Sequence, residues 1–131
     1  MLVVRQRSYT TEVMQWRINT MPLISIESNQ ALSDKAQLAT ISQAVASMLS
    51  KPESYVMVKY THNEMMLFAG NDAPLAHVKL KSLGLPEDQT ANYSNKIVAL
   101  LAEILNISAE RIYIEFANPA RHMWGWNGAT F

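Results

Sequence analysis

Pro22 is the residue of this chain whose chemistry depends most on where the chain starts. It follows Met21 in the stretch "INTMPLISIES", Ile18 to Ser28. A proline at the amino terminus carries a free secondary amine, which can act as a base once its pKa lies near neutrality. An internal proline nitrogen is an amide with negligible basicity, and such a proline can simply open an edge strand. The sequence thus leaves two interpretations of Pro22, a terminal residue with a free secondary amine or an internal structural residue.

Other patterns that carry chemistry are missing from the sequence. The chain has no cysteine, which excludes disulfides, thiolate zinc sites and cysteine nucleophiles. His62, His77 and His122 stand far apart, without the spacing that puts two ligands on one helix. The four glycines form no phosphate-binding loop, and there is no Gly-x-Ser-x-Gly motif. We therefore expect no metal, no cofactor and no hydrolase chemistry.

The composition limits the class of protein. The 131 residues are 49% hydrophobic and 17% charged, with eleven basic and eleven acidic residues, which suits one globular domain with a sizeable core. No basic run marks a nucleic-acid surface, and no apolar run approaches the ~18 residues of a membrane span. We expect a cytoplasmic protein without nucleic-acid or membrane partners; release without a signal peptide is the alternative.

Residues 1–20 differ from the rest of the chain. They contain three arginines and one glutamate, and they lack the continuous apolar segment of a secretory signal. We interpret them as an amino-terminal extension, or as the product of a mis-called start, and place the folded domain at residues 21–131. A short extra strand or an arm is the structural alternative, because "LVV" and "VMQWRI" have some strand character.

The elements that would position Pro22 follow from the periodicity of apolar residues. Alternation predicts strands, and apolar residues at helical spacing predict two amphipathic helices. Ser33 is expected to cap the first helix, and Lys51-Pro52 to end it. The predicted strands cover 22–28, 55–61, 65–70, 76–83 and 111–117, and the predicted helices cover 34–50 and 92–106.

The second half of the chain repeats the first half. Overlaying "KPESYV" on "SAERIY" aligns strand, helix and strand at a spacing of 57 residues, with Ile26 over Leu83 and Met48 over Leu105. Each crossover helix allows its flanking strands to run parallel. We therefore predict an α+β domain, a tandem β-α-β pseudo-repeat with a four-stranded sheet and two helices on one face. Apolar residues in the strands predict that the open face packs against other subunits.

Residues 21–131 resemble the macrophage migration inhibitory factor family of the tautomerase superfamily, with D-dopachrome tautomerase as a close relative. The resemblance rests on short motifs in the same order, namely "MPLI", "KPESY", "FAG", "SLG", "AERIYI" and "GWNGATF". It implies a homotrimer whose sheets line a central channel, with sites at the subunit boundaries.

The resemblance also implies roles for two residues as catalytic groups. It makes Pro22 the base, provided that Pro22 is exposed as the amino terminus. Lys51 would hold an anionic substrate and stabilise the developing enolate charge. Its structural alternative is a cation at the end of a helix, worth about 0.3 to 1 kcal/mol there.

Four more positions are implied as substrate contacts. Leu83 would contribute its main chain, Tyr113 would reach the pocket of a neighbouring subunit, and Trp126 would form an aromatic wall; subunit packing is the alternative. Glu115 stands where the mammalian cytokine has asparagine, and it would disfavour acidic substrates if it points inward. Trp124 replaces a smaller residue and would narrow the pocket. The segment 75–78 has no Cys-x-x-Cys, which excludes thiol oxidoreductase activity.

The function implied is keto-enol tautomerisation of a small α-keto acid of the phenylpyruvate or dopachrome type. The alternative is a cytokine-like trimer that binds a receptor or another protein partner, with little or no physiological catalysis. Both alternatives share the same fold, and the sequence leaves them open.

Overall fold

The computed structural model describes residues 21–131. The predicted extension, residues 1–20, lies outside the described residues. Within them, no helix is both long and apolar enough to cross a membrane.

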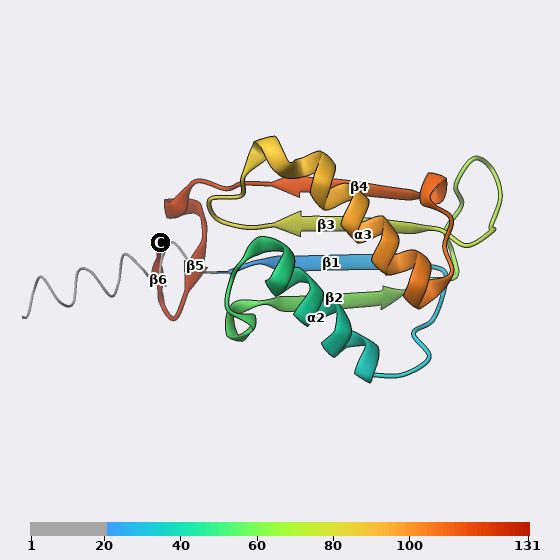
Figure 1. The fold of residues 1–131 in the computed structure, drawn as a ribbon, viewed down its shortest axis with the longest axis horizontal. Coiled ribbons are helices and arrows are strands. Elements are labelled where there is room, and N and C mark those ends of the chain that lie inside the picture. Colours follow the sequence, from blue (N-terminus) through green and yellow to red (C-terminus); the bar gives the residue numbers. More distant parts are fainter. Residues whose placement is uncertain (1–20) are drawn as a thin grey trace, which may run out of the picture.

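One mixed sheet organises the domain (Figure 1). Its strand order is β2-β1-β3-β4. The two inner strands are antiparallel to each other, and each outer strand is parallel to its inner neighbour. The strands are β1 (Leu23–Ser28), β2 (Met57–His62), β3 (Ala76–Lys81) and β4 (Ile112–Ala117). The predicted four-stranded α+β sheet, with parallel strands within each half, is confirmed.

Two helices cover one face of this sheet (Figure 1), as predicted. They are α2 (Ala36–Leu49) and α3 (Thr90–Leu105). Their buried positions include Ile41 and Val45 on α2 and Ile97 and Leu101 on α3, at the spacing expected of one helical face. These side chains pack on Ile24, Ile26, Val78 and Leu80 of the sheet, which are fully buried.

The two halves match each other at the helix ends. Ser50 and Asn106 each end a helix in the left-handed conformation, both with a φ of 53°. A 3₁₀ turn follows each of them, at Glu53–Tyr55 and at Ala109–Arg111. These caps lie 56 residues apart (50 to 106), so the overlay spacing of 57 is wrong by one residue here. The overlay also aligned Ile26, which lies within β1, with Leu83, which lies beyond the end of β3.

Two local predictions are wrong. Ser33 does not cap the first helix; Lys35 is the N-cap residue, and the Asp34 carboxylate accepts a hydrogen bond from the Ala36 amide at 2.9 Å. The segment 65–70 forms no strand, and its pairing is limited to an isolated bridge between Phe68 and Asn71. Its length suited a strand, but no neighbouring strand offers a partner along its length.

The open face of the sheet is more polar than the sequence suggested. The apolar residues of β2 and β3, such as Val58 and Leu80, face the helices. Because side chains alternate along a strand, charged residues occupy much of the other face, with Lys59, Lys79 and Glu115 exposed. The prediction of an apolar open face is therefore wrong, although Met57 and Tyr113 are exposed on it. Whether the face packs against other subunits stays a prediction.

The carboxyl-terminal segment folds back to the end of the sheet where β1 begins (Figure 1). A 3₁₀ turn, Arg121–Met123, precedes the short hairpin of β5 (Gly125–Trp126) and β6 (Ala129–Thr130). The hairpin therefore brings residues from the end of the chain close to Pro22.

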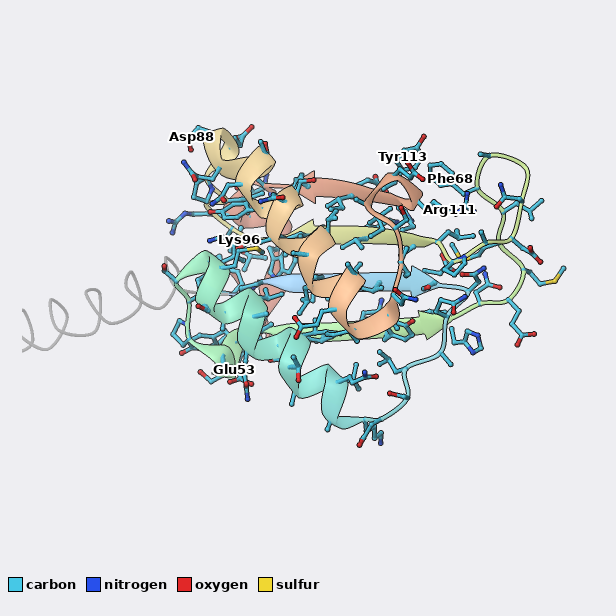
Figure 2. The ribbon with its side chains drawn as sticks, turned by 45° about the vertical axis from the view of Figure 1, so that its right-hand side comes forward. Glu53, Phe68, Asp88, Lys96, Arg111 and Tyr113 are labelled. Carbon is cyan, nitrogen blue, oxygen red and sulfur yellow. The ribbon has the colours of Figure 1, made fainter. Side chains whose placement is uncertain are left out.

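At the opposite end of the sheet, Arg111 lies beside Phe68 and Tyr113 (Figure 2).

Candidate functional site around Pro22

Pro22 lies buried at the start of β1. Its side chain is among the fully buried ones, and its carbonyl oxygen accepts a hydrogen bond from the Met57 amide at 2.9 Å. Extending the antiparallel register of β1 and β3 by one residue places Pro22 opposite Ser82. Met21 before it has a φ of 75°, in the left-handed region that residues with a side chain rarely adopt. The strand thus fixes Pro22 next to the end of β3, after a strained link.

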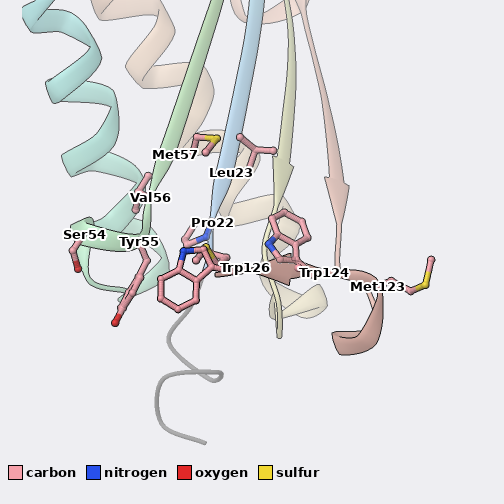
Figure 3. Close-up of a pocket in the computed structure, with 11 residues that line it drawn as sticks. Pro22, Leu23, Ser54, Tyr55, Val56, Met57, Met123, Trp124 and Trp126 are labelled. Carbon is pink, nitrogen blue, oxygen red and sulfur yellow. The ribbon is translucent and has the colours of Figure 1, made fainter. Parts of the chain in front are cut away.

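A cavity of about 500 Å³ opens at Pro22 (Figure 3). A volume of this size is typical of small-molecule sites. The lining is mostly apolar and aromatic and comes from three parts of the chain: the start of β1, the turn before β2 and the carboxyl-terminal segment. The residues are Met21, Pro22, Leu23, Ser54, Tyr55, Val56, Met57, Met123, Trp124, Gly125 and Trp126.

Aromatic contacts hold the wall of this cavity. The ring of Tyr55 meets that of Trp126 edge to face, with centroids 6.4 Å apart. Trp126 also stacks on Phe131, with centroids 6.5 Å apart and planes 14° from parallel. Such pairs add to the apolar burial of the rings and restrict their orientation. Trp126, predicted as an aromatic wall residue, lies in the same cavity as Pro22.

Lys51 lies next to this cavity but is not one of its lining residues. Its Nζ donates hydrogen bonds to the Ser82 hydroxyl at 2.9 Å and to the Leu83 carbonyl oxygen at 2.8 Å. Because Ser82 is opposite Pro22, these bonds place the ammonium group beside the start of β1. Burial lowers the pKa of Lys51 from its ordinary value of 10.5.

Leu83 enters this arrangement through its main chain, as the resemblance implies. Its side chain is buried at 3% exposure, whereas its carbonyl oxygen is the acceptor for Lys51. The following residue, Gly84, has a φ of 66°, which lets the chain turn away from the sheet. The turn keeps the Leu83 carbonyl directed at the lysine.

Tyr113 and Glu115 lie elsewhere in the described chain. Tyr113 pairs with His77, five residues along β3 from Ser82, which is about 17 Å at 3.3 Å per residue. It lines a separate cavity of about 270 Å³ with Phe68 and Leu75. Glu115 contacts the ring nitrogen of His77 on the open face of the sheet. Within one chain, neither residue reaches Pro22.

The sequence reasoning missed several residues of the cavity wall. Tyr55 belongs to the "KPESY" motif, so the motif itself was the signal that could have pointed to it. Met57 is 60% exposed at the start of β2 and lines the cavity because β2 pairs with β1. Met123 comes from the 3₁₀ turn before the hairpin. No sequence motif marks Met123 as a cavity residue; it lines the cavity because the carboxyl-terminal hairpin returns to the sheet.

The chemistry open to this site is that of an apolar pocket with the Lys51 cation beside it. A titratable amine at Pro22 would lose protons more readily there, because burial disfavours the ammonium form. Lys51 supplies a positive group that can interact with an anion. Across residues 21–131, no three histidine, aspartate or glutamate side chains gather as a metal site.

The fold and the cavity define an α+β domain of two β-α-β units, with a buried proline in the lining of an apolar pocket. The family model described as macrophage migration inhibitory factor (MIF) matches residues 21–131. The chain belongs to the MIF family.

Individual relatives agree with this assignment. The MIF homolog of Brugia malayi is 37% identical and the MIF of Mus musculus 32% identical, each over 85% of this chain and 99% of its own length. The MIF structure from Trichinella spiralis superposes with a TM-score of 0.79 at 31% identity, over 83% of this chain and 99% of that one. The MIF homologue from Prochlorococcus marinus gives 0.77 at 37% identity, over 83% and 98%. Family and fold thus match what the motifs of the sequence suggested.

Proposed function

We propose that the protein is a keto-enol tautomerase for small α-keto acids of the phenylpyruvate type, acting when Pro22 is the amino-terminal residue. Family membership supports a function of the MIF and tautomerase type in general terms. The observation that carries the specific proposal is the position of Pro22, fully buried at a cavity of about 500 Å³ with an aromatic wall.

In this reaction a proton moves between carbon and oxygen. The Pro22 amine removes a proton from the carbon next to the ketone, the electron pair of that C–H bond forms the enolate, and the oxygen then takes up a proton. The reverse sequence converts the enol to the ketone. Nothing is oxidised or reduced, so neither a cofactor nor a second substrate is needed.

The environment of Pro22 suits a base at neutral pH. An ordinary terminal amine has a pKa near 8, so only about a tenth of it is free base at pH 7. An apolar pocket and the neighbouring Lys51 both disfavour the ammonium form, which raises the fraction of free amine. An aliphatic and aromatic lining also limits competition from water for the substrate's polar groups.

Lys51 is proposed as the group that holds the anionic substrate. Its ammonium group already donates to Ser82 and Leu83, which orient it beside Pro22. The charge would stabilise the enolate oxygen or the carboxylate of the keto acid.

A homotrimer is part of the proposal. Its support is the family relationship and not an apolar sheet face, because the open face is polar. An assembly would also allow Tyr113 and Glu115 to reach the Pro22 cavity of another subunit, which they do not reach within one chain. Sedimentation equilibrium should give three times the monomer mass at micromolar concentration; a stable monomer would contradict the proposal.

We also propose a cytoplasmic location, on the absence of cysteine.

The decisive experiment compares three forms of the protein: the full chain, a form that begins at Pro22, and the latter with one alanine added before Pro22. Only the second has a proline with a titratable nitrogen. We expect rapid tautomerisation of phenylpyruvate by that form and nearly none by the other two, with equal far-ultraviolet circular dichroism. Mass spectrometry confirms each amino terminus.

Equal rates from all three forms would mean that Pro22 is not the base. Inactivity of all three, with intact folding, would favour the alternative of a protein whose role is binding a partner.

A further inference from the structure

Lys81 is a second cation near the Pro22 cavity, on the other side of the sheet from Lys51. Like Lys51, it contacts residues of the lining without being one of them. It is the last residue of β3 and pairs directly with Leu23, the residue that follows Pro22 and lines the cavity. Because side chains alternate along a strand, Lys81 points to the open face, while Ser82 and its partner Lys51 lie on the helix side. The two lysines therefore flank the start of β1.

Trp124 holds the ammonium group of Lys81 at the cavity edge. The Nζ of Lys81 lies 5.2 Å from the centroid of the indole ring of Trp124, within the range of a cation–π contact. Trp124 itself lines the cavity, as does Leu23 (Figure 3). The contact keeps a flexible lysine on the ring of a residue that lines the cavity and replaces part of its hydration with an aromatic face.

No carboxylate of the described residues neutralises Lys81. The ion pair found in residues 21–131 joins His77 to Glu115, and the partner of Lys81 on β4 is Ala117. Lys79, two residues earlier on the same face, instead pairs with Glu115 in register. Lys81 thus combines a position at the cavity with a positive charge that a ligand could meet.

We propose that Lys81 and Trp124 form a specificity-determining subsite for a second anionic group, so that the preferred substrates are α-keto acids with an additional carboxylate at the end remote from the ketone. This inference rests on the proposed keto-acid function. Lys51 then interacts with the keto-acid end and Lys81 with the remote carboxylate. An extended aromatic substrate would lie along the apolar lining between them.

A matched pair of ligands tests the subsite: 4-carboxyphenylpyruvate and 4-methylphenylpyruvate, which differ at the para position in charge but little in bulk. Isothermal titration calorimetry on the full chain should give a dissociation constant about tenfold lower for the carboxylate compound, as one charge-assisted hydrogen bond implies. Lys81→Met should remove this preference and leave the affinity for the methyl compound within about twofold. Lys81→Arg should keep the preference, because the positive charge is retained.

Lys79→Met is the matched control. Lys79 lies on the same strand and the same face, but two residue pairs farther from the cavity, opposite Ser25. It should leave the preference unchanged, whereas Trp124→Ala should weaken it by releasing the lysine. Equal affinities for the two compounds in the wild type, a preference that survives Lys81→Met, or binding of neither compound would each overturn the inference.

The same variants separate this inference from the proposed reaction. A charge preference that depends on Lys81, together with no turnover by the form that begins at Pro22, would retain the subsite and reject the tautomerase mechanism. Turnover of phenylpyruvate by that form, together with a charge preference that Lys81→Met leaves unchanged, would retain the tautomerase mechanism and reject the subsite.

Discussion

The side-chain nitrogen of Lys51 donates a hydrogen bond to the main-chain oxygen of Leu83, 2.8 Å away. This bond joins the second residue after α2 to the second residue after β3. The adjacent bond to Ser82 adds a second acceptor. Together they place a partly buried ammonium group beside Pro22, where an anionic substrate would need it.

Lys51→Ala should lower kcat/KM for phenylpyruvate by about 10- to 100-fold in the form that begins at Pro22. The loss of one charge-assisted hydrogen bond to the substrate is worth about 1.5 to 3 kcal/mol. Ser82→Ala is the control, because it removes one acceptor but leaves the ammonium group and its Leu83 contact in place. An unchanged kcat/KM for Lys51→Ala would return Lys51 to a structural role.

The rate of the form that begins at Pro22 should rise with pH through one ionisation below the ~8 of an ordinary terminal amine. The free amine is the active species, so activity is lost as pH falls through this pKa. Pro22→Ala should keep part of the activity, because alanine also offers a terminal amine. Steady-state rates between pH 5 and 9 check both statements, and a flat profile would argue against an amine base.

Glu115→Asn should lower KM for phenylpyruvate in the assembled protein. In the proposed trimer, the substitution removes a negative charge near the substrate bound to a neighbouring subunit. Stability should change by less than about 1 kcal/mol, because the contact with His77 is exposed. Glu103→Gln, an exposed position on α3, is the control, and an unaltered KM would remove Glu115 from the site.

Arg111→Met should destabilise the loop between β2 and β3. The guanidinium donates to the carbonyl oxygens of Phe68, Asn71, Ala73 and Pro74 at 3.0 to 3.2 Å. Losing these bonds should lower the free energy of unfolding by about 2 to 3 kcal/mol. Urea denaturation checks the value, with exposed Arg121→Met as the control. Equal losses for the two variants would show that the loop contacts contribute little.

Tyr60→Phe should reduce the sensitivity of the fold to alkali. Burial raises the pKa of Tyr60 above its ordinary 10.0, although the nearby Ser28 hydroxyl opposes the shift in part. The unfolded chain therefore loses this proton first, and stability falls as pH rises above 10.0. Urea midpoints from pH 8 to 11 should fall less steeply in the variant.

Tyr60→Phe also carries a constant loss at lower pH. The hydroxyl donates to the Gln30 carbonyl oxygen, so its removal should cost about 0.5 to 1.5 kcal/mol at pH 8. Parallel pH curves for the two proteins would show that Tyr60 does not contribute to the alkaline loss.

The sequence was sufficient where local pattern determines structure. The strand at Leu23–Ser28 alternates, and its buried residues Ile24 and Ile26 face the helices as alternation requires. The helices bury Ile41 and Ile97 at the predicted spacing. Motifs conveyed the family as well, because "KPESY" and "GWNGATF" keep their order along the chain. Periodicity is a property of neighbouring residues, so it can be read without coordinates.

Only the tertiary structure decided which residues share a site. Pro22 and Trp126 are far apart in sequence, and they line one cavity because the carboxyl-terminal hairpin returns to the start of β1. Strand pairing places Lys81 beside Leu23 and keeps Tyr113 at the other end of the sheet. It also directs the apolar side chains of β2 and β3 to the helices, which left the open face polar. Strand order and the return of the hairpin depend on contacts between segments far apart in the sequence, and the periodicity of one segment does not specify its partner.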